Sequence, residues 1–293
     1  MTAEPRDDGP RPVILITGAS AGIGQALARQ LSRRRPAPVL VLTARRLERL
    51  DRLADELRAS SPDLHVAIVP ADLADPAAPG RLAGEVVDRF GGIDVLINNA
   101  GLGLPKQFAA ADPELLVRQM AVNFTAPLML TRLCLPSLIE RKGLIINIGS
   151  AITCLANSAL GAYGATKAGL AYWNDGLRRE LQPQGVRVCL VEPGPIKTEF
   201  MDAVQSRVPP GERTDPINDN LMPWMSAEVD EVARQVARLL DHPRRRVSVL
   251  RRLVWTFRAL GVVARLCPPL GDWLVVTFSR RPLSPSSTAE EPA

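Results

Sequence analysis

Residues 13–24 of this 293-residue chain read VILITGASAGIG, an apolar and β-branched run followed at once by a glycine-rich turn. An unbroken run of this kind is typical of a strand that helices cover on both faces. Glycines after such a strand let the backbone turn tightly and approach a pyrophosphate, whose charge is then stabilised by the free amides of the next helix. The stretch therefore predicts a strand, turn and helix that bind a dinucleotide, with the spacing TGxxxGxG rather than GxGxxG.

The same letters contain GxSxG, the pattern of a hydrolase nucleophile, with Ser20 at its centre. A serine nucleophile needs a histidine base, and the chain has only His65 and His242, which we expect on the surface beside strand or helix ends. An elbow on the first strand also has no separate loop before it to supply oxyanion donors. A Ser20 hydrolase is therefore kept only as a remote alternative.

Further along the chain, short apolar runs alternate with longer helical patterns, which predicts βαβ units and an α/β fold. Seven strands with six crossovers form a doubly wound parallel sheet of the Rossmann type, which we expect to be extended by a C-terminal amphipathic segment. Strands are expected at residues 13–17, 39–43, 64–69, 93–97, 144–148, 186–191 and 247–250, and helices at about 21–34, 46–59, 76–90, 112–139, 160–181 and 228–240.

This pattern predicts one main domain with short additions at its ends. The first residues mix acids and prolines and lack the basic start and apolar core of a secretory signal. Residues 201–225 are Pro-rich and polar with an apolar end, which is typical of a substrate-binding loop. We expect a disordered leader at 1–11, the Rossmann domain at 12–250, a basic amphipathic extension at 251–281 and a disordered tail at 282–293.

The chain carries 36 Lys and Arg against 31 Asp and Glu, a formal net charge of +5. The excess is local, because residues 244–281 hold nine arginines and one acid, Asp272, and the rest of the chain is slightly acidic. Nucleic-acid binding would need a basic groove-facing surface or a known reading motif, and the sequence shows neither. We therefore expect no nucleic-acid partner.

Four cysteines lie far apart without a CxxC pair, and only two histidines accompany them. The sequence therefore predicts neither a metal site nor a disulfide scaffold, and a reduced, cytoplasmic compartment fits best. Arg258 and Arg265 interrupt the most apolar region, so we expect no ordinary membrane-spanning helix.

The end of the second predicted strand indicates which cofactor is preferred. An acid about 20 residues past the glycines would bind a ribose 2′-hydroxyl, whereas an arginine there would accept a 2′-phosphate. This chain has Ala44, Arg45 and Arg46, which favours NADP(H). Arg45 is the expected phosphate ligand, and Arg46 is interpreted as the start of a solvated helix face.

A series of motifs continues in order along the chain. They are TGASAGIG at 17–24, Asp72-Leu73 after the third strand, NNAG at 98–101, Asn123, Ser150, YGATK at 163–167 and Pro193-Gly194. Their order, spacing and placement on the predicted elements resemble the short-chain dehydrogenase/reductase family over residues 13 to about 200. The resemblance implies an oxidoreductase that interconverts a carbonyl and an alcohol with a nicotinamide cofactor.

The resemblance also implies roles for individual residues. Lys167 would hold the nicotinamide ribose, Ser150 would hydrogen-bond the substrate oxygen and Asn123 would position a water in a proton relay. Asp72 would meet the adenine, and Pro193-Gly194 would form one side of the nicotinamide pocket. The implied catalytic residues are Asn123, Ser150, Tyr163 and Lys167, and the implied cofactor-binding residues are Gly18, Ser20, Ala21, Gly22, Ile23, Gly24, Arg45, Asp72, Leu73, Asn99, Ala100, Gly101, Tyr163, Lys167, Pro193, Gly194, Ile196 and Thr198.

Elementary chemistry also supports an acid–base role for the pair Tyr163 and Lys167. Four residues apart on a helix, they share one face. A tyrosine with a pKa near 10 is a poor acid–base group at neutral pH, and a nearby ammonium is expected to lower that pKa. One departure from the family pattern is Ala21, where many NADP-dependent members have a basic residue, so the preference depends on Arg45.

The tail has a pattern of its own. Arg251, Arg258 and Arg265 recur every seven residues, which places them on one narrow stripe of an otherwise apolar helix. Through residues 250–278 such a segment could lie on a membrane surface. It could equally pack on the domain, line a dimer interface or cover the substrate cleft, and these alternatives stay open.

The sequence therefore predicts an NADP(H)-dependent carbonyl reductase. We expect a lipophilic ketone or aldehyde as substrate, such as a steroid, retinoid or keto-lipid, and hence a place in lipid metabolism. The enzyme is expected to be a cytoplasmic homo-oligomer, peripheral to a membrane if the tail binds lipid. The alternative is a non-catalytic NADP-binding scaffold or sensor of the same fold, which the intact set of four catalytic residues disfavours.

Overall fold

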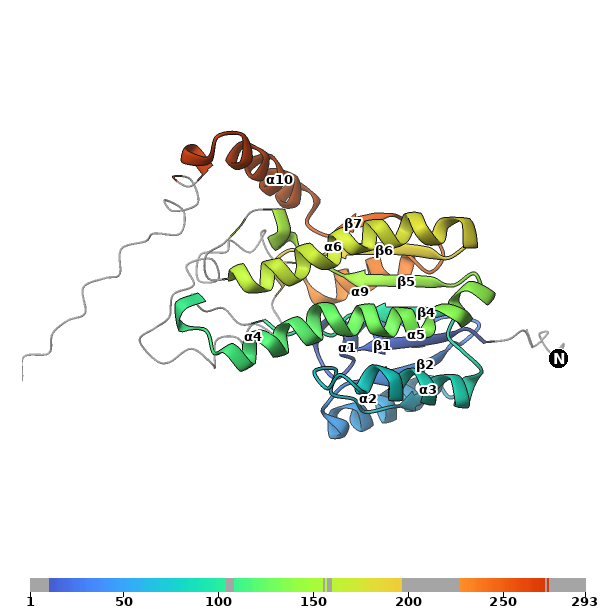
Figure 1. The fold of residues 1–293 in the computed structure, drawn as a ribbon. Coiled ribbons are helices and arrows are strands. Elements are labelled where there is room, and N and C mark those ends of the chain that lie inside the picture. The colour runs from blue at the N-terminus through green and yellow to red at the C-terminus, as the bar shows by residue number, and fades with distance from the viewer. Residues whose placement is uncertain are drawn as a thin grey trace, which may run out of the picture.

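The computed structural model describes residues 11–103, 108–154, 156, 160–196, 227–271 and 273. Its centre is a seven-stranded, all-parallel sheet with the strand order β3-β2-β1-β4-β5-β6-β7 and helices on both faces (Figure 1). The predicted doubly wound fold is confirmed. The strands are β1 Val13–Thr17, β2 Val39–Thr43, β3 His65–Ile68, β4 Val95–Asn98, β5 Leu144–Ile148, β6 Arg187–Glu192 and β7 Arg246–Ser248.

The helices follow the predicted alternation, with one difference in the middle of the chain. The single helix expected over 112–139 is divided by a π-helical turn at Ala121–Thr125, labelled η2. The extension also contains a helix, α10, which begins immediately after β7 and its following turn. The α-helices are α1 Gly22–Ser32, α2 Leu47–Ser60, α3 Ala78–Phe90, α4 Pro113–Met120, α5 Ala126–Glu140, α6 Gly161–Leu181, α9 Val229–Arg238 and α10 Arg251–Leu266.

Three of the predicted segments fall wholly or largely outside the described residues. They are the leader at 1–11, of which only residue 11 is described, the loop at 201–225 and the tail at 282–293. The described part of the extension ends at residue 273. The domain boundaries stay predictions.

The strand order creates a switch point beside β1. The chain runs from β1 outward through β2 and β3, then returns to place β4 on the other side of β1 and continues outward to β7. In such sheets, ligands bind outside the carboxyl ends of the strands at this point. The ends of β1 and β4 are therefore where a site is expected.

Two apolar layers enclose the sheet. Successive residues of β1 point to opposite faces. Ile14 and Ile16 pack with residues of α1, α2 and α9, whereas Val13 and Leu15 pack with residues of α3, α5 and α6. β1, β2, β4 and β5 are buried along their whole length, which explains why their sequences are mostly apolar.

The run Pro113–Glu140 is long and apolar enough to cross a membrane when length and composition alone are considered. Core helices of soluble proteins pass the same test. Leu130, Cys134 and Leu138 of α5 are fully buried in the layer that also contains residues of β1 and β5. The apolar character of this run therefore serves core packing.

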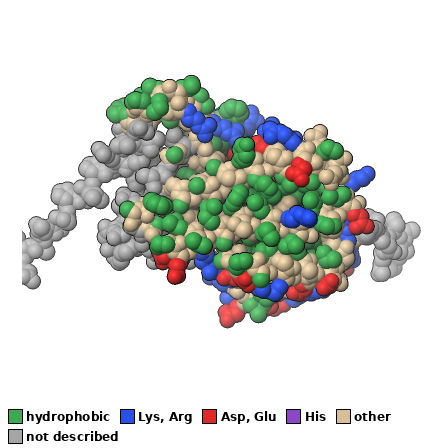
Figure 2. Space-filling model, in the orientation of Figure 1, with side chains coloured by type: hydrophobic (Ala, Val, Ile, Leu, Met, Phe, Trp, Pro, Cys, Tyr) green, Lys and Arg blue, Asp and Glu red, His purple; other side chains and the backbone are tan. Residues whose placement is uncertain are grey.

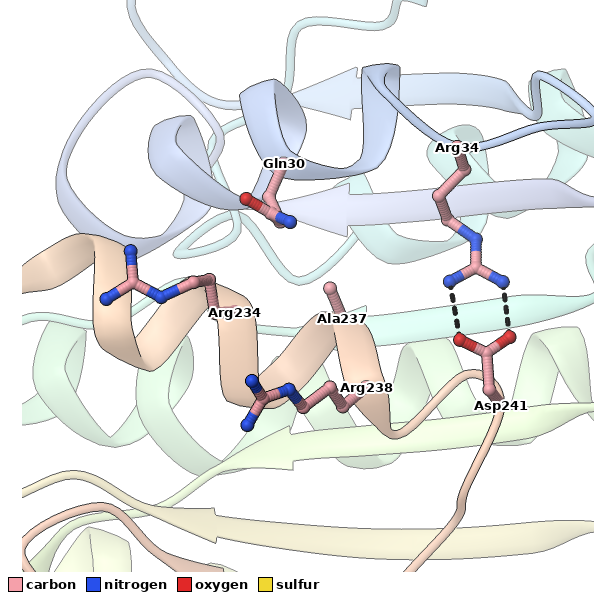
Figure 3. A pocket seen from close by; sticks show the side chains of 6 residues that line it. All are labelled: Gln30, Arg34, Arg234, Ala237, Arg238 and Asp241. Atoms are coloured by element: carbon pink, nitrogen blue, oxygen red, sulfur yellow. Dashed lines mark hydrogen bonds and ion pairs between the residues drawn. The ribbon is translucent and has the colours of Figure 1, made fainter.

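A polar pocket lies between α1 and α9, at the end of α1 remote from the glycine turn (Figure 3). Arg34 forms a two-pronged ion pair with Asp241 there, with N–O distances of 2.9 and 2.5 Å. Gln30 and three residues of α9, Arg234, Ala237 and Arg238, complete the lining. This contact joins the end of α1 to the turn after α9.

Leu42→Ala tests the core. Leu42 is fully buried in β2, so the truncation removes apolar contacts and leaves a cavity that costs about 2–5 kcal/mol of unfolding free energy. Urea unfolding followed by circular dichroism measures the loss. Leu47→Ala, at a half-exposed position on α2, is the matched control and should change stability by less than about 1 kcal/mol. Equal effects of the two substitutions would contradict this packing.

Candidate active site

The glycine turn lies at the expected carboxyl end of β1 and leaves no space for side chains. Gly18 has a left-handed φ of +68°, and a Cβ on it would lie 2.8 Å from the Cα of Ala100. A Cβ on Gly24 would lie 2.4 Å from the carbonyl oxygen of Gly18. The turn, the start of α1 and the segment after β4 therefore touch through backbone atoms.

Hydrogen bonds hold these three segments in place. The Thr17 hydroxyl accepts from the backbone amides of Asn99 and Ala100, both at 2.9 Å. The Asn99 side chain donates to the carbonyl oxygen of Thr17 at 2.8 Å and to that of Gly18 at 3.3 Å. Asn99 thus shapes the turn, as its position in NNAG indicates.

The start of α1 suits an anion. Within the described residues, its N-cap Ala21 makes no side-chain capping bond, and the first turn of the helix contains no acid. Unpaired amides and the helix dipole favour negative charge at such an end. The turn from Gly18 to Gly24 therefore fits the pyrophosphate of a dinucleotide.

Arg46 has a place that the sequence did not predict. Its guanidinium donates from Nη2 to the hydroxyl of Ser20 at 3.3 Å, so it lies against the glycine turn. The interpretation of Arg46 as a solvated helix face is therefore incomplete. Arg45 is exposed at the end of β2, and the two arginines together give this edge a positive charge.

The hypothesis that Ser20 is a hydrolase nucleophile requires a histidine base, and the structure places neither histidine in that role. His65 begins β3 and pairs in register with Val39 at the start of β2, at the amino ends of the strands. His242 follows the end of α9, and its amide donates to the carbonyl of Arg238. Ser20 follows the carboxyl end of β1, so neither histidine lies where it would activate Ser20.

Asp72 lies at the carboxyl end of β3 but is engaged within the protein. Its carboxylate accepts from Arg118 of α4 at 2.5 Å and from the amide of Ala74 at 3.1 Å. Leu73 beside it is buried in the layer that contains α3 and α5. Contact of Asp72 with an adenine stays a prediction, and the structure adds Arg118 as its partner.

Ser150, Tyr163 and Lys167 meet at the carboxyl end of β5. Ser150 lies two residues after the end of the strand, and its hydroxyl hydrogen-bonds the Tyr163 side chain. Lys167 is 4% exposed, with Nζ donating to the carbonyl of Ile148 at 2.8 Å and lying 5.9 Å from the centre of the Tyr163 ring. The predicted spacing of 13 and four residues brings the three together.

Burial controls the protonation of this pair. It raises the pKa of Tyr163 to about 12, against a smaller lowering by the hydrogen bond to Ser150. It also lowers the pKa of Lys167 to about 8. The expectation that Lys167 lowers the tyrosine pKa is not met here, because desolvation disfavours both charged forms and Nζ is directed at a backbone carbonyl.

Asn123 lies in the π-helical turn and is fully buried. Its Oδ1 accepts from the amide of Leu102 at 2.7 Å, and its Nδ2 donates to the carbonyl of Leu102 at 2.8 Å and to the Thr166 hydroxyl at 3.1 Å. Thr166 in turn donates to the carbonyl of Tyr163 at 2.7 Å. Asn123 therefore joins the segment after β4 to the helix that carries Tyr163, and its role with a water stays a prediction.

Gly101 brings the NNAG segment next to Asn123 and to Lys167 of α6. A Cβ on Gly101 would lie 3.7 Å from Oδ1 of Asn123 and 3.9 Å from Nζ of Lys167. Pro193 joins from the other side, since its carbonyl accepts from the amide of Ala151 at 2.8 Å. Ile196 forms a bridge with Ala227, whereas Thr198 lies outside the described residues.

A buried chain of amides holds α6 against the sheet. Asn98 of β4 donates to Asn147 of β5 at 2.8 Å, and Asn147 donates to Asn174 of α6 at 2.9 Å. Sequence reasoning did not use Asn147 or Asn174, although a lone asparagine inside an apolar strand was a visible signal. These bonds fix the helix that carries Tyr163 and Lys167.

Glu192 is a second residue that sequence reasoning missed. It ends β6, is 1% exposed and directly precedes Pro193. Its carboxylate pairs with Arg246 at 3.0 Å, accepts from Ser248 at 3.2 Å and pairs with Arg258 of α10. Arg258 of the expected arginine stripe therefore pairs with a buried carboxylate of the domain, whereas Arg251 and Arg265 are exposed.

Comparison with known proteins gives matches over most of the chain. The family described as short chain dehydrogenase matches residues 12–208. Serine 3-dehydrogenase of Rhizobium radiobacter is 39% identical over 188 residues, which are 64% of this chain and 73% of that protein. Dehydrogenase/reductase SDR family member 7B of Mus musculus is 33% identical over 227 residues, which are 76% of this chain and 68% of that protein.

A solved structure is similar over almost the whole chain. It is a short-chain dehydrogenase from Sphingobium yanoikuyae in complex with NADPH, with a TM-score of 0.70 and 30% identity. The match covers 94% of this chain and 99% of that chain.

Lys167→Met tests the burial of the ammonium. Between pH 8 and 10.5 the unfolded chain binds a proton at Lys167 that the native protein does not, so the stability of the wild type rises with pH in this window. At pH 7 the substitution removes a penalty of about 3 kcal/mol and loses one hydrogen bond worth about 1 kcal/mol. The protein without cofactor should therefore gain about 2 kcal/mol in urea unfolding at pH 7.

The gain should disappear above pH 10.5, where Lys167 is neutral in both states. Urea unfolding of both proteins at pH 7, 9 and 11 measures the difference. A difference that does not change with pH would contradict the buried, charged lysine.

Proposed function

This chain belongs to the short-chain dehydrogenase family, and we propose that it is an NADP(H)-dependent oxidoreductase that reduces a lipophilic ketone or aldehyde. The observation that carries the proposal is the hydrogen bond between the side chains of Tyr163 and Ser150, with Lys167 buried behind them. A phenol and a hydroxyl that meet at a strand end give one carbonyl oxygen two partners.

NADPH supplies the hydride when it is bound. The chain's own residues would hold it along the ends of β1, β4 and β6. The turn from Gly18 to Gly24 would take the pyrophosphate, Arg45 and Arg46 the 2′-phosphate, and Lys167 the nicotinamide ribose. The similarity to a dehydrogenase solved in complex with NADPH supports this choice.

The proton chemistry favours reduction. With a pKa raised to about 12, Tyr163 is protonated at neutral pH and is ready to give a proton to a carbonyl oxygen. Ser150 would hold that oxygen, and Lys167, with a pKa of about 8, is mostly charged at pH 7 and would favour the phenolate that is left. Oxidation of an alcohol would need Tyr163 to start as the phenolate.

The buried lysine also counts against a non-catalytic NADP-binding scaffold. A scaffold gains nothing from a desolvated ammonium beside a desolvated phenol, since each disfavours folding in its charged form. Perturbed groups of this kind gather at sites of chemistry.

The next part of the proposal concerns the class of substrate. The described residues include exposed aromatic and aliphatic side chains on α10, next to the turn after Ser150, which supports a lipophilic carbonyl such as a steroid, retinoid or keto-lipid. A place in lipid metabolism would follow. Because serine 3-dehydrogenase is a relative, serine belongs in any substrate screen.

We also propose that the protein is a cytoplasmic homo-oligomer, peripheral to a membrane. Apolar side chains gather over the face formed by α5 and α6 (Figure 2). Met129 and Leu133 of α5 and Tyr172 of α6 are exposed there. Self-association would bury them.

Tyr163→Phe tests catalysis. Loss of the hydroxyl should lower NADPH-dependent reduction by roughly 100- to 10,000-fold and leave NADPH binding intact. The assay follows NADPH oxidation with ketones and aldehydes graded by chain length and ring number, with serine oxidation as a further arm. The only other tyrosine, Tyr172, is 87% exposed, so Tyr172→Phe is a matched control that should retain activity. Turnover by Tyr163→Phe close to wild type would refute the proposal.

Arg46→Gln tests the phosphate site. A charge-assisted hydrogen bond to a 2′-phosphate contributes about 1.5–3 kcal/mol, so the Kd for NADPH should rise roughly 10- to 100-fold. The Kd for NADH, which lacks this phosphate, should stay near its original value. Arg45→Gln measured in parallel divides the contribution between the two arginines, and Arg52→Gln on α2, the helix that Arg46 precedes, is the control. An equal loss for NADPH and NADH would show that Arg46 only supports the turn.

A further inference from the structure

α10 lies outside the residues that match the family, yet it is fixed to the catalytic end of the domain. Arg258 pairs with the buried Glu192, and it also hydrogen-bonds the side chain of Cys154. A Cβ on Gly261 would lie 2.0 Å from the carbonyl oxygen of Cys154, so the helix touches the turn Ala151–Cys154 directly. This turn follows Ser150, and α10 therefore has a defined orientation beside the active site.

Beside the side that contacts the domain, α10 presents an apolar and exposed stripe, and the Arg258 guanidinium carbon lies 5.7 Å from the centre of the Trp255 ring at its edge. Trp255, Val262 and Leu266 are 61%, 53% and 81% exposed. Their spacing of seven and four residues places them on one face of the helix. Trp273 beyond the helix is also 61% exposed, and Figure 2 shows the apolar side chains collected over this projecting helix.

Positive charge surrounds this apolar stripe. Arg251, Arg252 and Arg265 are all exposed on α10. The sequence from residue 244 to 271 contains no acid to neutralise them. An exposed apolar face with indole rings and arginines is the pattern of helices that lie in the interface of a membrane.

The positive charge of α10 also indicates which kind of partner would cover its apolar stripe. A symmetric pair of α10 stripes would bring the same arginines of two copies together, and like charges at close range oppose such a contact. Anionic headgroups would pair with the guanidiniums while the acyl region accepts Trp255 and Leu266. We propose that α10 docks this protein on an anionic lipid bilayer and thereby presents the active site to substrates dissolved in that bilayer.

The second half of this proposal rests on the proposed reductase function. Because the docked helix lies on the turn after Ser150, the distance from lipid to the catalytic residues is short. A carbonyl compound held in the bilayer would reach the site without crossing water.

The first test removes charge. The triple variant Arg251→Gln, Arg252→Gln, Arg265→Gln is compared with Arg33→Gln, Arg52→Gln, Arg132→Gln, which removes the same charge at exposed positions directly after α1, on α2 and on α5. Full-length proteins are mixed with vesicles of phosphatidylcholine containing about one third phosphatidylserine, and with vesicles of phosphatidylcholine alone. The α10 variant should bind anionic vesicles on the order of 100-fold more weakly, since each arginine near the surface contributes a factor of about five. The control should bind like the wild type.

The second test removes the apolar stripe. Trp255→Ser with Leu266→Ser should also weaken vesicle binding, whereas Leu47→Ser on α2 should not. Sedimentation of the proteins without vesicles is measured alongside. If the stripe variant dissociates an oligomer but binds vesicles normally, α10 is an interface between copies and the proposal is wrong.

Further results would decide separately whether the docking proposal and the reductase proposal hold. No binding of the wild type to anionic vesicles, or equal losses in both arginine variants, would overturn the docking proposal. Reduction of a water-soluble and a vesicle-embedded long-chain ketone is then compared, and the α10 arginine variant should show a raised KM for the embedded ketone alone. Vesicle binding without turnover of any carbonyl would refute the reductase function and leave the docking intact.

Discussion

A small set of hydrogen bonds between the ends of β1 and β4 holds the site together. Thr17 and Asn99 exchange bonds through side chain and backbone, so the glycine turn cannot move independently of the segment that leads to Gly101. From there, Asn123 continues the connection to α6. The glycine turn and the helix that carries Tyr163 and Lys167 therefore share one rigid frame, built at the point where the strand order reverses.

This frame holds two ionisable side chains in positions where burial disfavours their charged forms. Tyr163 and Lys167 are each stabilised in the neutral form by desolvation, and the amide chain through Asn147 prevents α6 from shifting to relieve it. Opposite charges in such a place attract more strongly than they would in water. Because Lys167, with a pKa of about 8, is already mostly charged at pH 7, it would attract the phenolate that forms when a proton leaves Tyr163.

Local sequence was sufficient for the strands, the glycine turn and the grouping of Ser150 with Tyr163 and Lys167, because these depend on periodicity and on strand ends meeting at one edge. It was not sufficient for contacts between distant parts of the chain. Arg258 lies 66 residues beyond Glu192, and nothing in the spacing of the arginines distinguished the one that points inward. The pKa shifts depend on burial in the assembled fold, so the charge of Lys167 alone gave the wrong direction for Tyr163.

The ion pair between the buried Glu192 and Arg258 of α10 makes the C-terminal extension part of the interior of the domain. A chain that ended before Arg258 would leave a carboxylate inside the protein with one guanidinium fewer, directly ahead of Pro193. Shortening the protein at this place would therefore act as a core mutation in the strand that leads to Pro193.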